Sequence, residues 1–274
     1  MKILYYIFLG ILQGITEPIP VSSSGHVLIF KTLFKRLTSG FTVDYETLAT
    51  ITNFGSLIAI IIIYRKEIIR LLKSFFKYIG GKKDKSTKSD YSYALKIIIA
   101  TIPAGLLGIV FVKLNVLDKL ENNIKFIGVM LLITALFLYL IKDFKGKKEK
   151  DNITYLDALI IGLSQMVSII PGISRSGATI VGSMYRDLKR EVAFNFSFIM
   201  YIPISIATSI LGIKDLLSLN LSFGLFLLYI IAFILAFIFT YIFTKWFAKI
   251  VKEGKLIYFS IYCLIIGLCV IIFM

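Results

Sequence analysis

Two polar stretches, 152 positions apart, carry the residues of this chain that are best suited to chemistry. The first runs from Gly10 to His26 and the second from Gly162 to Ala178. Five residues recur identically at this offset: Gly10, Gln13, Ser22, Ser24 and Gly25 correspond to Gly162, Gln165, Ser174, Ser176 and Gly177. The first copy adds Glu17 and His26, and the second adds Arg175. A duplicated hydrophobic segment interrupted by Gly and Pro indicates a binding site between two membrane repeats.

In the first stretch, a carboxylate and an amide stand side by side. Glu17 follows Gln13 by four residues, so on a helix both side chains share one face. Pro18 and Pro20 then end the helix. The residues after them should form a turn with free amides and hydroxyls: Ser22, Ser23, Ser24, Gly25 and His26. Carboxylate and amide oxygens suit a hard cation such as Mg²⁺ or Ca²⁺, whose shell phosphate and water would complete. The alternative is that Glu17 simply lies near water.

In the second stretch, Arg175 follows a break at Pro171 and Gly172. Its guanidinium presents a rigid fork of donors that matches phosphate oxygens. Further donors should come from hydroxyls and from the amides at the start of the next helix; they belong to Ser174, Ser176, Gly177 and Thr179. The alternative is a structural ion pair between Arg175 and Glu17.

His26 is the only histidine in the chain. Ser23 precedes it by three residues, so the two could act as nucleophile and general base, or His26 could itself accept a phosphoryl group. Direct attack by water with His26 as the base fits the sequence equally well. A lone histidine is also often a satisfied polar side chain.

The elements that position these residues are apolar and long. The chain is 58% hydrophobic and has a mean hydropathy of +0.87. Six apolar runs come close to the roughly 20 residues that span a bilayer; they are 48–64, 94–112, 124–141, 192–211, 223–244 and 256–274. Asn53 and Asn195 lie within two of these runs and should face the helix bundle, since an amide is costly in lipid.

The net charge of +15 is distributed in a way that argues against nucleic acid as a partner. Of the 31 Lys and Arg, 21 lie in four loops between apolar runs, namely 65–93, 142–155, 185–191 and 245–255. This pattern is typical of cytoplasmic loops of a membrane protein. The other connections, 35–47, 113–123 and 212–222, should then lie outside.

These loop positions predict the architecture. Segments 1–34 and 156–184 each begin and end on one face, so each should be a re-entrant hairpin. We predict an all-α integral membrane protein with one membrane domain, 1–274, in which six transmembrane helices and two hairpins form an inverted-topology repeat. The repeats are 1–141 and 156–274, and 142–155 is a cytoplasmic linker. The hairpin tips should line a polar chamber near the midplane.

Four motifs resemble those of the undecaprenyl-diphosphate phosphatase family, also called bacitracin-resistance phosphatases. They are Q-G-I-T-E-P-I-P-V-S-S-S-G-H (13–26), P-G-I-S-R-S-G-A-T-I (171–180), I-P-A-G-L-L-G (102–108) and F-S-F (196–198) with Pro203. The resemblance implies a cell-membrane enzyme that removes the terminal phosphate of a polyprenyl diphosphate. Such an enzyme recycles the lipid carrier for peptidoglycan synthesis, confers bacitracin resistance, uses a divalent cation and has its active site on the outer side.

Carried over by motif, Glu17 is the metal-associated acid, with Gln13 beside it. Ser23 and His26 belong to the nucleophile and base set. The diphosphate is held by Arg175 with Ser174, Ser176 and Thr179, and we expect the amides and hydroxyls of Ser22, Ser24, Gly25 and Gly177 to bind substrate too. Two positions differ from the family pattern, which often has Glu where this chain has Gln13 and Asn195.

Two further expectations stay open at this point. A transporter that moves a polyprenyl phosphate across the membrane with the same anion site is the alternative function, because inverted repeats with broken helices are a transporter architecture. The glycines Gly105, Gly108, Gly212 and Gly224 should permit close helix packing, and the face of Gly105 and Gly108 would permit a homodimer.

Overall fold

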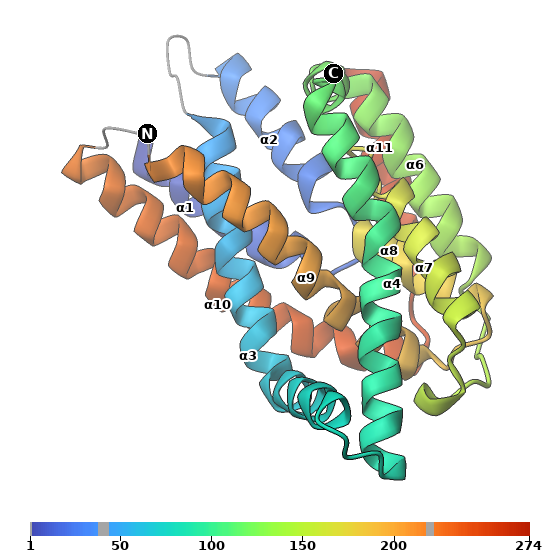
Figure 1. The fold of residues 1–274 in the computed structure, drawn as a ribbon. Helices are drawn as coiled ribbons and strands as arrows, with labels where there is room; N and C mark the ends of the chain where they lie inside the picture. Colours follow the sequence, from blue (N-terminus) through green and yellow to red (C-terminus); the bar gives the residue numbers. More distant parts are fainter. Residues whose placement is uncertain (1, 38–43, 218–221) are drawn as a thin grey trace.

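The structure is a computed structural model that describes residues 2–37, 44–217 and 222–274 (Figure 1). These residues form helices and no strand; an isolated bridge joins Lys148 and Leu188. The helices are α1 (Lys2–Thr16), α2 (Ser23–Leu37), α3 (Tyr45–Ile79), α4 (Lys85–Lys113), α5 (Val116–Glu121), α6 (Ile124–Leu140), η1 (Lys150–Asn152), α7 (Tyr155–Val167), α8 (Arg175–Tyr185), α9 (Arg190–Leu217), α10 (Phe223–Glu253) and α11 (Ile257–Phe273). The middle parts of the expected outer loops 35–47 and 212–222 lie outside the described residues.

Four of the described helices are long and apolar enough to cross a bilayer: Tyr45–Ile79, Lys85–Lys113, Arg190–Gly212 and Phe223–Glu253. Their number and composition make the chain a multi-pass membrane protein. The other two predicted spans correspond to α6 and α11, which have 17 residues each. At 1.5 Å per residue each is about 25 Å long, somewhat less than the roughly 30 Å of a hydrocarbon core.

The four long helices fall into a central and a peripheral pair. In their most apolar windows, α3 and α9 are 44% and 50% buried within the protein, whereas α4 and α10 are each 22% buried. α3 packs against α9, and α4 and α10 expose large apolar side chains such as Leu106, Ile109, Ile230 and Ile234. Such surfaces are expected of helices that face lipid.

The first helix of each predicted hairpin packs on a helix from the other half of the chain. α1 lies along α10, and α7 lies along α4. A Cβ atom at Gly10 would lie 2.6 Å from the carbonyl oxygen of Ala232, and one at Gly162 would lie 2.5 Å from that of Ala100. The duplicated glycines therefore let each hairpin approach a helix backbone that any side chain would push away.

The basic segment 65–93 is mostly helical, so our expectation of a loop there is wrong. α3 continues to Ile79 and α4 begins at Lys85, which leaves only 80–84 between them. Arg70 forms ion pairs with Glu67 on its own helix and with Asp90 on α4. These pairs hold the two helical extensions together beyond their apolar parts.

The glycines of the small-residue faces also differ from expectation. A Cβ atom at Gly105, Gly108 or Gly224 would meet nothing within 4 Å, so these glycines do not mediate packing among the residues that the structure describes. Gly212 does so, against Thr50. A homodimer through Gly105 and Gly108 stays a prediction.

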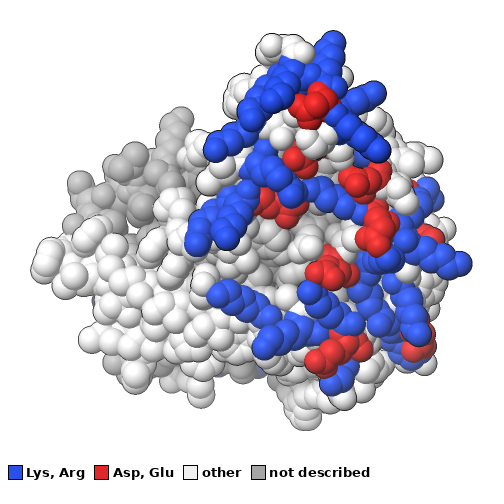
Figure 2. All heavy atoms as spheres, turned by 90° about the horizontal axis from the view of Figure 1, so that it is seen from below, with Lys and Arg blue, Asp and Glu red and all other residues white. Residues whose placement is uncertain are grey.

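Lys and Arg side chains crowd over the end of the molecule that lies at the bottom of Figure 1, as Figure 2 shows. At this basic end Asp157, which is fully buried, accepts hydrogen bonds from Lys148 and Arg186 and completes a capping box with Thr154. Burial raises the pKa of the Asp157 carboxyl, but these hydrogen bonds outweigh burial and lower the pKa to about 2. The cluster fixes the linker against the start of α7.

Candidate functional site

The two polar motifs form two turns that cap the following helices in the same way. The first turn, 17–22, precedes α2, and the second turn, 168–174, precedes α8. Ser22 Oγ accepts a hydrogen bond from the amide of Gly25 at 3.2 Å, and Ser174 Oγ accepts one from the amide of Gly177 at 3.1 Å. The recurring Ser-x-x-Gly spacing is therefore an N-cap that satisfies a helix-end donor.

The two turns meet in space although they are far apart in the chain. A Cβ atom at Gly25 would lie 3.3 Å from Cα of Gly172, and one at Gly177 would lie 3.4 Å from Cβ of Pro20. Ser176 Oγ donates to the carbonyl of Ile19 at 3.2 Å. We call this meeting point the junction.

Glu17 is the centre of the junction and is 8% exposed. Its Oε2 accepts hydrogen bonds from Gln13 Nε2 at 2.8 Å and from Ser23 Oγ at 2.6 Å. Its Oε1 accepts one from Arg175, whose guanidinium lies 3.7 Å from the ring centroid of Tyr201. The structure thus brings four predicted site residues together and contains the ion pair that the sequence left as an alternative.

His26 is held in a different environment. Its Nδ1 lies 2.8 Å from the carbonyl oxygen of Ser22, which can only accept, so Nδ1 carries the proton. Its Nε2 lies 2.8 Å from the hydroxyl of Tyr262, and the two rings stack at 5.5 Å. Both ring nitrogens are therefore engaged, and the hydrogen bond of the Ser23 hydroxyl goes to Glu17 instead of to His26.

The remaining predicted substrate-binding residues differ in their exposure and in their hydrogen-bond partners. Ser24 is exposed beside the first turn, and its Oγ lies 3.4 Å from Ser22 Oγ. Ser174 and Ser176 are buried, with their Oγ atoms 3.3 Å apart. The hydroxyl of Thr179 donates to the carbonyl of Arg175 and lies in hydrogen-bond contact with Ser197, so it fastens α8 to α9.

Three residues at the junction were not identified as site residues from the sequence. Asn53 Oδ1 accepts a hydrogen bond from Gln13 Nε2 at 2.6 Å, although the residue is exposed. Its place inside an apolar run predicted that it faces other protein groups; its amide contacts Gln13, but the residue is otherwise exposed. Tyr201 and Tyr262 could not be recognised as site residues from the sequence, because aromatic residues are common in the apolar runs. Asn195 instead accepts from the hydroxyl of Tyr64 in a separate cavity of about 200 Å³.

The donor set at the junction fits a hard cation that shares its shell with a phosphate. Among the described residues no group of three or more His, Cys, Asp or Glu could hold a metal ion. However, Glu17 Oε2 and Asn53 Oδ1 both accept from the Gln13 amide nitrogen, and Ser23 Oγ lies 2.6 Å from Glu17 Oε2, so three oxygens gather around this side chain. Gln13 would join them as a ligand if its amide turned to present its oxygen. Mg²⁺ and Ca²⁺ prefer such ligands, and Mg²⁺ in particular is commonly held by one or two carboxylates together with substrate phosphates.

Comparison with known proteins identifies the family. The family model described as bacitracin resistance protein BacA matches residues 6–269. The chain belongs to the BacA family. Its relatives include undecaprenyl-diphosphatase 1 of Bacillus licheniformis, which is 44% identical over 273 residues, covering 100% of this chain and 98% of that protein. Undecaprenyl-diphosphatase 2 of Bacillus thuringiensis is 43% identical over 99% of this chain and 98% of that protein. Undecaprenyl-diphosphatase of Oceanobacillus iheyensis is 42% identical over 99% of this chain and 97% of that protein. The predicted family is confirmed.

Proposed function

We propose that this chain is an undecaprenyl-diphosphatase, which removes the terminal phosphate of undecaprenyl diphosphate and so recycles the lipid carrier of peptidoglycan synthesis. The observation that carries the proposal is the junction, where Ser23 Oγ, Glu17 and Arg175 form one hydrogen-bonded chain. Relatives that are 40–44% identical over nearly their whole length bear the name of this activity.

In our proposal the substrate diphosphate binds to Arg175 in place of the Glu17 carboxylate. In the resting arrangement the guanidinium is neutralised by Glu17 and stacked on Tyr201. A diphosphate carries more charge than one carboxylate and matches the same donor fork, so it competes for Arg175. The N-termini of α2 and α8 meet at the junction, and their free amides favour the same anion. Once Arg175 holds phosphate, the Glu17 carboxylate is released for chemistry.

Ser23 is the nucleophile and Glu17 its general base. The hydroxyl already donates to Glu17 at 2.6 Å, which is the geometry that proton removal requires. Ser23 Oγ forms a bond to the terminal phosphorus, its proton passes to Glu17, and the bond to the bridging oxygen breaks, which releases undecaprenyl phosphate. Water then attacks the phosphoserine, giving inorganic phosphate and restoring the hydroxyl. His26, held by Tyr262, positions the first turn of α2.

A divalent cation belongs to this site in our proposal. Glu17, Gln13 and Asn53 would hold it, and it would neutralise negative charge on the phosphate oxygens. Glu17 would thus hold the cation and would also accept the proton of Ser23.

The site faces the outer side of the cell membrane, and α6 and α11 complete six spans around two re-entrant hairpins. The position of Asn53 supports this orientation. Asn53 lies eight residues after the start of α3, about 12 Å along the helix. Arg65, where the basic segment begins, follows twelve residues later, about 18 Å along the helix. Because basic segments stay in the cytoplasm, the junction is nearer the opposite surface.

The test is phosphate release from undecaprenyl diphosphate by the purified protein in Mg²⁺ or Ca²⁺ and then in chelator, together with Glu17→Ala and Arg175→Ala. We expect cation-dependent turnover by the wild type and its loss in both variants. Lipid movement between leaflets of proteoliposomes without phosphate release would instead favour the transporter.

A further inference from the structure

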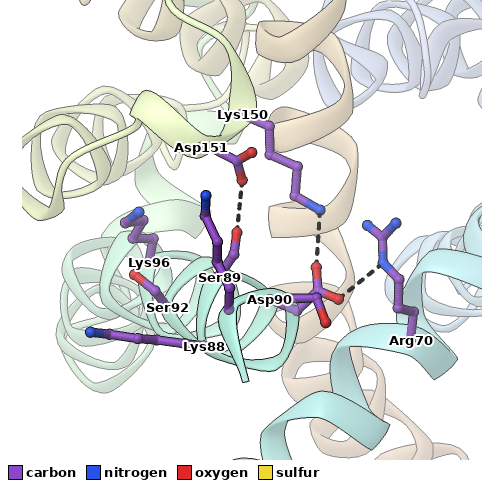
Figure 3. A pocket seen from close by; sticks show the side chains of 10 residues that line it. Arg70, Lys88, Ser89, Asp90, Ser92, Lys96, Lys150 and Asp151 are labelled. Atoms are coloured by element: carbon purple, nitrogen blue, oxygen red, sulfur yellow. Dashed lines mark hydrogen bonds and ion pairs between the residues drawn. The ribbon is translucent and has the colours of Figure 1, made fainter. Parts of the chain in front are cut away.

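A polar cavity lies at the basic end, away from the junction and apart from the smaller cavity of Tyr64 and Asn195. It has a volume of about 890 Å³ and lies between the end of α3, the start of α4 and η1 (Figure 3). Five cationic and two acidic side chains line it together with three serines: Arg70, Lys85, Lys88, Lys96, Lys150, Asp90, Asp151, Ser86, Ser89 and Ser92. The proposed phosphatase reaction uses none of these residues.

The acidic side chains of the cavity are already engaged. Asp90 forms ion pairs with Arg70 at 3.4 Å and with Lys150 at 3.6 Å. Asp151 accepts a hydrogen bond from Ser89 Oγ at 2.7 Å. In Figure 3 the dashed lines of these contacts gather around the two acids, whereas Lys88 and Lys96 carry none. The lining therefore holds an excess of positive charge that its own acids do not balance.

Lys96 is the residue that most strongly indicates an anion in this cavity. It is only 7% exposed, yet it forms no ion pair with any described carboxylate. Its ammonium lies 5.5 Å from the ring centroid of Tyr155, whose hydroxyl contacts Ser92 Oγ at 3.2 Å. Asp157, the nearby buried acid, is occupied by other cations. Asp151 and Asp157 act on Lys96 only from beyond ion-pair distance. A buried lysine without a direct ion-pair partner is uncommon, so an anion from outside the chain would supply the close counter-charge that these acids do not.

The depth of Lys96 indicates where that anion resides. Lys96 lies at the boundary between the basic segment 65–93 and the apolar run 94–112, which is the level of lipid headgroups. Basic pockets between membrane helices on the cytoplasmic side bind anionic headgroups. Ammonium groups and serine hydroxyls are both good donors to phosphate oxygens.

We propose that this cavity is a binding site for a phosphate group, with Lys88 and Lys96 as its main cationic ligands. The phosphate belongs either to an anionic lipid of the inner leaflet or to a soluble phosphate, and both sources use the same chemistry. The site is separate from the junction and does not depend on the proposed reaction.

The experiment compares two double variants that lose the same charge. Lys88→Gln/Lys96→Gln alters the cavity, and Lys82→Gln/Lys249→Gln alters exposed lysines of the basic end that do not line it. One arm titrates detergent-purified protein with inorganic phosphate by calorimetry. The other arm measures, by native mass spectrometry, retention of phosphatidylglycerol over phosphatidylcholine. The junction is intact in both variants, so a difference between them reports on the cavity.

We expect the cavity variant to bind at least about tenfold more weakly than the wild type in one arm, and the control variant to bind within about twofold. The arm that responds identifies lipid or soluble phosphate as the source. Equal binding by the two double variants, or no binding by the wild type in either arm, would overturn the proposal.

A single variant guards against misfolding. Lys96→Met removes the buried charge and keeps an apolar stem, so it should melt at or above the wild type in ligand-free detergent. The responding anion should then raise the melting temperature of the wild type and leave that of Lys96→Met unchanged. An equal rise in both proteins would contradict the assignment.

Discussion

The contact between Ser23 and Glu17 leads to a quantitative prediction about catalysis. The Ser23 hydroxyl donates to Glu17 Oε2 at 2.6 Å, so in our mechanism the two side chains act as one unit. General base catalysis contributes about 10²–10⁴-fold, which corresponds to about 3–5 kcal/mol of transition-state stabilisation. We therefore expect Glu17→Gln and Ser23→Ala each to lower kcat by about this factor.

The double variant decides whether the two residues depend on each other. If Glu17 acts through Ser23, then Glu17→Gln/Ser23→Ala should be within about twofold of Ser23→Ala alone, because residues of one catalytic unit are not additive. Arg175→Lys is the control: it weakens phosphate binding, so its effect should multiply with that of Ser23→Ala. The assay is phosphate release from undecaprenyl diphosphate at saturating cation. A Glu17→Gln/Ser23→Ala protein at least tenfold slower than Ser23→Ala would refute the reasoning that Glu17 acts on the chemistry through Ser23.

Further predictions concern packing, charge and the cation. Gly10→Ala and Gly162→Ala should each destabilise the protein by about 1–3 kcal/mol in detergent unfolding, because the new methyl meets a helix backbone, whereas Gly224→Ala should not; equal effects at all three positions would contradict the packing described. Asp157→Asn should cost about 2 kcal/mol at neutral pH. Since the folded pKa of this carboxyl is depressed, the difference from wild type should shrink as pH falls from about 4 towards 2, and a difference independent of pH would count against the ion cluster. Gln13→Glu adds a carboxylate to the site, so half-maximal activity should require about tenfold less cation; an unchanged requirement would remove Gln13 from the proposed ligands.

Local signals in the sequence predicted the elements of the junction well. Pro18 and Pro20 end α1, and the repeated Ser-x-x-Gly begins α2 and α8, because Pro cannot continue a helix and Ser caps one. The identity of Glu17 and Arg175 as site residues followed from their charge within apolar surroundings. Their mutual contact was one of two possibilities, and the sequence could not choose between them.

Contacts between distant segments could not be predicted in the same way. Tyr262 reaches His26 from α11, across 236 positions, and nothing in a uniformly apolar helix distinguishes it from its aromatic neighbours. The length of α3 was also missed, because hydropathy locates the membrane boundary but does not locate the end of a helix that continues into water. Gly105 and Gly108 do not pack against other described residues, because a small residue favours packing only where a partner helix is present, and composition alone does not say whether that partner lies in the same chain.

The most direct test of the active site at the junction is chemical modification at the exposed Ser24. In a Cys269→Ser background, Ser24→Cys places a thiol beside Ser23, and Ser86→Cys places one at the basic end as a control. A membrane-impermeant thiol reagent is added to each protein, and phosphate release from undecaprenyl diphosphate is measured before and after. Our account predicts that modification abolishes turnover by the Ser24→Cys protein and spares the Ser86→Cys protein. Full turnover by a Ser24→Cys protein shown to be modified would place the reaction elsewhere in the molecule.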